Sequence, residues 1–102
     1  MKIIVKNPGQ NPHYEWTDNT LEALQKVVGG YIEMIALAPD LAIICNEEGR
    51  IYGLPLNCNI CGVTFVGTIM AVGFKDEDFD DVPISIDEFI DYMEGKHDHD
   101  LD

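Results

Sequence analysis

Five consecutive apolar residues, Leu41-Ala42-Ile43-Ile44-Cys45, place the strongest constraint on the fold of this chain. An unbroken apolar run is typical of a strand buried on both faces, whereas a strand with one face in water alternates between apolar and polar residues. The chain has 102 residues, of which 46% are hydrophobic, so a single domain can bury such a strand. We therefore expect a sheet with this segment at its centre.

Four further strands are expected before residue 55. Lys2–Lys6 and His13–Thr17 flank a turn-rich segment and predict a hairpin, and Tyr31–Leu37 is another apolar segment. Asn46-Glu47-Glu48-Gly49 is a turn signal, so Arg50–Leu54 is expected to return along the central strand.

The rest of the chain predicts a loop, a long strand and a charged segment. Residues 55–62 are expected to form a loop. Val63–Phe74 is expected to be one strand, with Gly67 marking a bulge or a close backbone contact. Residues 76–82 are expected to form a charged loop.

Two amphipathic helices are predicted from their caps and apolar spacing. The first has Asn19 as its expected N-cap and ends at Gly29-Gly30. The second begins at Ser85, where Ser85 and Glu88 form a capping box, and Gly95 is its expected end. The predicted fold is an α+β single domain over residues 1–95, with a largely antiparallel sheet of five or six strands and two helices. Residues 96–102 are expected to be a flexible acidic tail containing histidines.

Acidic side chains are concentrated in the last quarter of the chain. Residues 76–102 hold 12 of the 19 Asp and Glu residues but only Lys96 among the six Lys and Arg residues, and the formal net charge is −13. Such a field repels nucleic acid and anionic membranes, so we expect neither as a partner; a basic protein surface is the expected one. The expected partner-binding residues are Asp76, Glu77, Asp78, Asp80, Asp81, Asp87, Glu88, Asp91 and Glu94.

Three stretches of the sequence resemble a known family. They are Asn19–Glu33, which contains Val28-Gly29-Gly30-Tyr31-Ile32-Glu33, then Cys45–Gly49 with Gly53-Leu54-Pro55, and finally Val66-Gly67-Thr68. In this order they resemble a family of small domains of unknown function carried mostly by bacteriophages and conjugative elements of Gram-positive bacteria. The resemblance implies a small accessory protein of a mobile element and implies no reaction, cofactor or catalytic residue.

Glu33 is unusual because it is a carboxylate on an otherwise apolar strand. Burial of an unpaired charge is costly, which leaves two interpretations: a position at the edge of the sheet, or a pocket residue. In the second interpretation the pocket lies near Tyr31, Glu33 and Tyr52.

Metal-binding patterns are incomplete. Cys58-Asn59-Ile60-Cys61 has the spacing of a zinc or redox motif, but the only other close pair of ligands is His97 and His99 in the tail. Asp76, Asp78 and Asp80 have the spacing of a calcium loop, but Asp81 occupies the position that requires glycine. We expect no metal site, although the cysteine pair and the tail stay open as weak chelators.

These observations favour a binding role over catalysis. No nucleophile–base pair, metal set or phosphate-binding loop is recognisable, so we expect no enzymatic activity and no cofactor. The favoured function is a non-enzymatic interaction protein, with two alternatives: an acidic DNA mimic that inhibits a host nucleic-acid-binding protein, and a small-molecule-binding domain. The odd number of cysteines and the lack of a signal-peptide pattern at Met1–Val5 predict a cytoplasmic protein.

Overall fold

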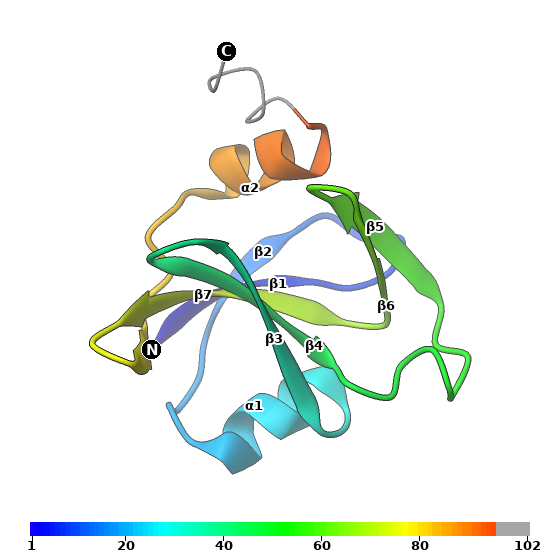
Figure 1. Ribbon diagram of the computed structural model, residues 1–102, viewed down its shortest axis with the longest axis horizontal. Coiled ribbons are helices and arrows are strands. Elements are labelled where there is room, and N and C mark those ends of the chain that lie inside the picture. Colours follow the sequence, from blue (N-terminus) through cyan, green and yellow to red (C-terminus); the bar gives the residue numbers. More distant parts are fainter. Residues whose placement is uncertain (96–102) are drawn as a thin grey trace.

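The computed structural model describes residues 1–95, which contain eight strands and two helices (Figure 1). In chain order the elements are β1 (Lys2–Lys6), β2 (His13–Trp16), α1 (Leu21–Val28), β3 (Ile32–Ala38), β4 (Leu41–Asn46), β5 (Leu56–Ile60), β6 (Val63–Val66), β7 (Ile69–Lys75), β8 (Asp78–Asp80) and α2 (Ile86–Met93). The predicted α+β class is confirmed.

One six-stranded sheet dominates the molecule, and all its pairings are antiparallel. The strand order is β2-β1-β7-β4-β3, and β8 pairs with the end of β7. All six residues of β4 are buried, so the apolar run is the interior strand that the sequence predicts. The strands β5 and β6 form a separate hairpin.

The sheet is covered on both faces, and side-chain alternation along β4 supplies both cores. Ala42 and Ile44 lie in the core beneath α1, whose Leu24 and Val28 are buried against them. Leu41, Ile43 and Cys45 lie in the opposite core, which α2 and the β5–β6 hairpin cover. Figure 1 shows the sheet between α1 at the bottom and α2 at the top.

The first helix begins one residue later than its sequence suggests. The N-cap is Thr20, whose hydroxyl accepts a hydrogen bond from the Ala23 N–H at 3.2 Å, and the prediction of Asn19 was wrong. The Asn19 amide instead donates to the Phe79 carbonyl at 2.9 Å, so a tertiary contact takes this side chain away from the helix.

The end of the first helix is as predicted. Gly29 has a left-handed φ of 79° and caps the helix. Gly30 lies against Asn46, where an added Cβ would be only 2.8 Å from the amide nitrogen. Gly29 therefore allows the chain to turn at the end of α1, and Gly30 allows Asn46 of β4 to lie close to the backbone.

The second helix matches its prediction closely. Ser85 and Glu88 form the expected capping box, and Glu94 is the last cap residue before Gly95, which has a left-handed φ of 75°. Phe89 is fully buried and anchors this helix on the sheet. The Ile86 N–H also donates to the Tyr14 hydroxyl at 3.0 Å, which connects the helix to β2.

The middle of the chain differs from the prediction. Arg50–Leu54 is not a strand, because β4 already pairs with β3 on one side and β7 on the other and has no free edge for it. The expected loop at residues 55–62 instead contains β5, which pairs with β6. The Asn57 amide fixes this hairpin by donating to the carbonyls of Lys6 at 2.8 Å and Gly67 at 2.7 Å.

The single strand expected over Val63–Phe74 is two strands, β6 and β7. Gly67 separates them with a left-handed φ of 71°, and its N–H donates to the Pro55 carbonyl at 2.7 Å. A Cβ at this position would also approach Leu54 to 2.7 Å. The glycine therefore marks a corner between two sheets and not a bulge within one strand.

Candidate functional site

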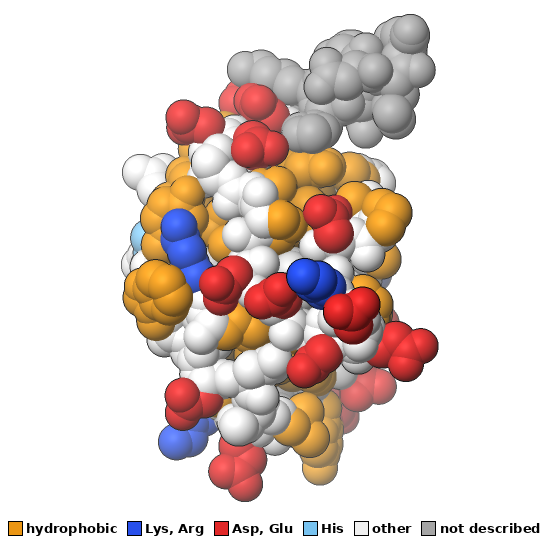
Figure 2. Space-filling view, turned by 90° about the vertical axis from the view of Figure 1, so that its left-hand side faces the viewer, with side chains coloured by type: hydrophobic (Ala, Val, Ile, Leu, Met, Phe, Trp, Pro, Cys, Tyr) orange, Lys and Arg blue, Asp and Glu red, His pale blue; other side chains and the backbone are white. Residues whose placement is uncertain are grey.

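The acidic surface comprises the nine carboxylates predicted from the sequence, and two elements carry it. Five belong to the β7–β8 turn and the segment after it, and four belong to α2 or its C-cap. Eight are exposed and Asp91 is half-exposed. Figure 2 shows red carboxylates spread over this side of the molecule, from the α2 end downward, among few blue cationic side chains.

A tight turn presents the first of these carboxylates to solvent. Lys75 pairs with Asp78, so Asp76 and Glu77 are the two central turn residues. Their φ angles of 52° and 65° are both left-handed, which defines the hairpin turn that normally prefers glycine at the second position. Both carboxylates therefore stand at the tip of the turn, and Glu77 occupies a strained backbone conformation.

Other members of the acidic surface hold the local backbone. Asp81 Oδ1 accepts a hydrogen bond from the Lys2 N–H at 2.8 Å, and Asp80 Oδ1 accepts one from the Asp81 N–H at 2.8 Å. Asp78 Oδ1 accepts one from the Phe79 N–H, also at 2.8 Å. Asp78 and Asp80 thus hold the backbone of their own segment, and Asp81 fixes that segment against β1, where the Val82 N–H also donates to the Lys2 carbonyl at 2.8 Å.

Four carboxylates of the acidic surface have no such structural task. Within residues 1–95, the side chains of Asp76, Glu77, Asp87 and Asp91 accept no hydrogen bond and form no ion pair. The nearby Lys2 ammonium instead lies 4.2 Å from the centre of the Tyr14 ring. These carboxylates are therefore available to an external cation.

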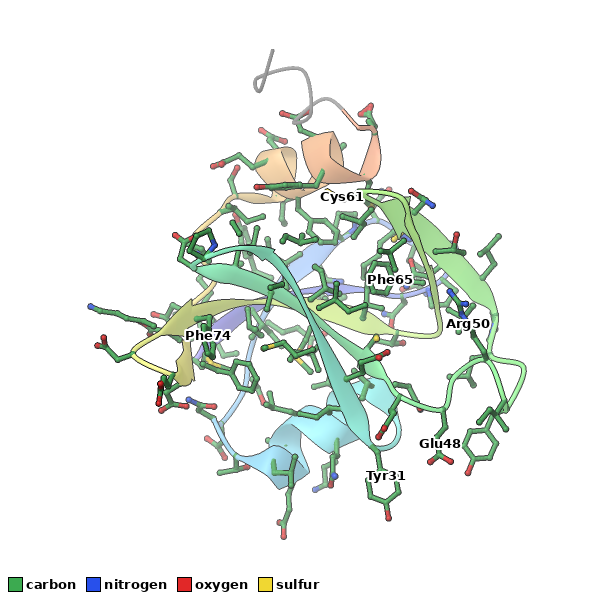
Figure 3. The ribbon with its side chains drawn as sticks, in the orientation of Figure 1. Tyr31, Glu48, Arg50, Cys61, Phe65 and Phe74 are labelled. Atoms are coloured by element: carbon green, nitrogen blue, oxygen red, sulfur yellow. The ribbon has the colours of Figure 1, made fainter. Side chains whose placement is uncertain are left out.

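The structure divides the residues of the expected pocket between two different pockets. Tyr31 and Tyr52 line one of about 310 Å³, together with Gln25, Gly29, Gly30 and Glu48. Glu33 lines the other. Figure 3 shows Tyr31 and Glu48 at the lower end of the molecule, below Phe65 and Arg50.

The second pocket, also about 310 Å³, lies between β6 and the β3–β4 ladder. Its ionisable lining residues are Glu33, Cys45, Glu47 and Arg50, and Phe65 forms part of its apolar wall. Arg50 donates to the Thr64 carbonyl at 2.8 Å, which holds its guanidinium beside β6. Glu33 is exposed on the edge strand β3 and also lines this pocket, which is not the one near Tyr31 and Tyr52.

Cys45 is a poor nucleophile in this pocket. Burial raises the pKa of its thiol to about 11, and the adjacent Glu33 carboxylate contributes to the rise. The thiol donates to Glu33 Oε1 at 3.7 Å. With this pKa the thiol is protonated at neutral pH. It is a poor nucleophile because the thiolate is the reactive form. Sequence reasoning did not connect Cys45 or Arg50 with Glu33. For Cys45 the available signal was its position opposite Glu33 on the paired strand, whereas Arg50 lies in a turn.

The cysteine pair lies in the β5–β6 hairpin. Cys58 is a half-buried residue of β5, where burial raises the pKa of its thiol, and Cys61 is exposed in the turn with a left-handed φ of 51°. Among residues 1–95, no three His, Cys, Asp or Glu residues are grouped to hold a metal ion. The expected tail, with Lys96, His97 and His99, lies outside the described residues.

Both helices of residues 1–95 are eight residues long, far from the length of about 20 residues that crossing a bilayer requires. The arrangement is that of a small α+β domain with an acidic surface and with separate pockets at Glu33 and at Tyr31. The chain belongs to the family of domains of unknown function called DUF3846, whose model matches residues 1–94. Neither a curated protein nor a solved structure matches the chain.

Proposed function

We propose that this protein is a non-enzymatic binding protein that uses its acidic surface to hold a basic surface of a protein partner. The observation that carries the proposal is that four carboxylates of this surface form no ion pair within residues 1–95: Asp76, Glu77, Asp87 and Asp91. A surface of one sign attracts the opposite sign over distances near the Debye length of about 8–10 Å and accelerates association.

The local structure supports the idea that the carboxylates are displayed for a partner. The turn places Asp76 and Glu77 in left-handed conformations, while Asp81 ties the segment after β8 to β1 through the Lys2 N–H. A turn that only needed to connect two strands would be more stable with glycine at the second position. The carboxylate of Glu77 is thus kept despite a conformational cost.

The ionisable groups support a role without catalysis. The pKa values that burial raises belong to Cys45 and Cys58, and the rise keeps these thiols in their unreactive form. Within the described residues, the Glu33 pocket pairs its carboxylate with a protonated thiol and contains no histidine as a base.

The cellular setting that we propose is the cytoplasm of a host that carries a mobile element. This part of the proposal is supported by the resemblance of the Val28–Glu33 motif to domains of phages and conjugative elements. A narrower form of the proposal is that the carboxylates imitate DNA phosphates and occupy the groove of a nucleic-acid-binding protein. That form predicts that duplex DNA competes with this protein for the same partner.

The test compares two triple variants with equal net charge. The first neutralises carboxylates of the acidic surface that make no hydrogen bond: Glu77→Gln, Asp87→Asn and Asp91→Asn. The control neutralises three exposed or half-exposed carboxylates elsewhere: Glu22→Gln, Glu47→Gln and Glu48→Gln. Affinity capture from a host extract at low salt, followed by elution at high salt, identifies the partner.

We expect the wild type and the control to capture the same basic protein, and the acidic-surface variant to lose most of it. Equal capture by all three proteins would contradict the proposal. Loss with the control alone would instead implicate the pocket of Tyr31, Tyr52 and Glu48. Adding duplex DNA to the captured complex then decides whether the partner's site is its DNA-binding groove.

A further inference from the structure

The strand β3 is an exposed edge without the features that normally protect one. It is the last strand of the sheet order, and six of its seven residues are apolar, with Glu33 as the exception. It contains no Lys or Pro, and its register shift lies at one end, between Ala36 and Ala38. Long apolar edges of this kind are templates for pairing with another strand.

The register shows which backbone groups of β3 are unpaired. The Glu47 N–H donates to the Tyr31 carbonyl at 2.8 Å, and the same register continues through Glu33 with Cys45 and Ile35 with Ile43. Because hydrogen-bonded pairs alternate in an antiparallel ladder, the groups of Ile32, Met34 and Ala36 point outward. Within residues 1–95 these groups have no hydrogen-bond partner.

The outward groups are spaced for pairing with an identical strand. A twofold axis at Met34 places Met34 opposite its own copy and Ile32 opposite Ala36 of the second copy. At each of these positions the N–H and the carbonyl of one residue then bond to the carbonyl and the N–H of the residue facing it. Met34 is 44% exposed, so its side chain is available to pack against its counterpart.

The positions of the charged residues allow this pairing, although the two chains carry the same net charge. In the twofold register Glu33 faces Ile35 of the second copy, so no two like charges are directly opposite. The β8 strand and its acidic turn lie on the β1 side of β7, whereas β4 and β3 lie on the other side. Pairing through β3 therefore keeps the two acidic turns at the outer parts of the assembly.

We propose that two copies of this chain pair antiparallel through β3 and form one continuous sheet about a twofold axis at Met34. This inference is independent of the proposed function, because it uses none of the nine carboxylates. The two also respond oppositely to salt. Screening weakens attraction between the acidic surface and a basic partner, but it strengthens association between two chains of charge −13.

Cross-linking of the full-length chain tests the register directly. In a hydrogen-bonded pair the Cα atoms are about 5.5 Å apart, within the range of a disulfide. We expect Met34→Cys to form a disulfide-linked dimer under mild oxidation. Ala36→Cys alone should not, because its two copies are about 13 Å apart along the strands. A mixture of Ile32→Cys and Ala36→Cys chains should form the mixed dimer.

The wild type, which keeps its own three cysteines, shows the background of cross-linking. A reversible dimer fraction that grows with protein concentration and with salt is expected in sedimentation equilibrium. Met34→Lys should abolish it, whereas Trp16→Lys, which makes the same charge change on the opposite edge strand, should not. A monomer at every concentration and salt, or a dimer that survives Met34→Lys, would overturn the proposal, as would equal cross-linking of Met34→Cys and Ala36→Cys.

Discussion

Replacement of Glu77 by glycine should stabilise this protein. Glu77 is the second central residue of the β7–β8 turn, with a left-handed φ of 65°. An L-residue in this conformation costs about 1–2 kcal/mol. Glycine avoids that cost but gives the unfolded chain more freedom, which is worth about 0.4–1 kcal/mol in the opposite direction.

The net expectation is a gain of roughly 0.5–1 kcal/mol in the free energy of unfolding. At about 4–8 °C per kcal/mol for a domain near 100 residues, the melting temperature should rise by several degrees. Urea unfolding followed by circular dichroism measures the change. The slope of the unfolding free energy against urea should not change, because the exposed surface is the same.

Two variants separate backbone strain from charge repulsion. Glu77→Gln removes the charge and keeps the conformation, so it should recover less stability than Glu77→Gly. Asp76→Gly tests the neighbouring position, where φ is 52° and aspartate is better tolerated, so it should gain less. The strain argument is refuted if glutamine stabilises as much as glycine, or if Glu77→Gly lowers stability.

Three further predictions concern the core and the alkaline range. Phe89→Ala should cost about 3–5 kcal/mol in unfolding free energy, measured by urea titration, because Phe89 is fully buried between α2 and the sheet. A milder loss, below about 1 kcal/mol, would mean that α2 is not docked as described. In Gly73→Ala the new Cβ would collide with the Asp81 carbonyl oxygen, so β8 should detach from β7. The amides of the β7–β8 ladder should then lose their protection from hydrogen exchange, and unchanged protection would refute this pairing. Burial and the Glu33 carboxylate raise the pKa of Cys45 from 9.0 to about 11. As the pH rises, the thiol therefore ionises in the unfolded chain before it ionises in the folded protein, and the free energy of unfolding should fall between about pH 9 and 11. Glu33→Gln should lower the pKa of Cys45 and reduce that fall in urea titrations at several pH values; an identical pH profile would show that Glu33 has no part in it.

The parts of the fold that local chemistry determines were predictable from the sequence. The run Leu41–Cys45 has no polar position to place in water, so its burial on both faces follows from composition alone. The capping box of Ser85 and Glu88 is likewise a contact within one turn of helix. Both predictions needed no knowledge of the rest of the chain.

The predictions that failed depended on contacts between distant residues. Arg50–Leu54 has a strand-like pattern, but β3 and β7 occupy both edges of β4, which only the complete topology reveals. Asn19 and Thr20 are both able to cap a helix, and the contact of Asn19 with Phe79 decides between them.

In the candidate site, too, local features were predictable and contacts between distant residues were not. Exposed carboxylates were visible in the sequence because a dense run of acidic residues cannot be buried. The pocket residues were not grouped correctly. Tyr31 comes before the first residue of β3 and lines the pocket at the end of α1, whereas Glu33 lies within the strand and faces Cys45. Tyr31 and Glu33 are only two positions apart in the chain, yet they line different pockets.

The most direct test of the acidic-surface proposal is the salt dependence of partner affinity. Isothermal titration of the captured partner should be repeated at several salt concentrations with the wild type, the Glu77→Gln, Asp87→Asn, Asp91→Asn variant and its matched control. We predict a steep loss of affinity with salt for the wild type and the control, and a shallower slope with weaker binding for the acidic-surface variant. Equal slopes and equal affinities for all three proteins would contradict the account.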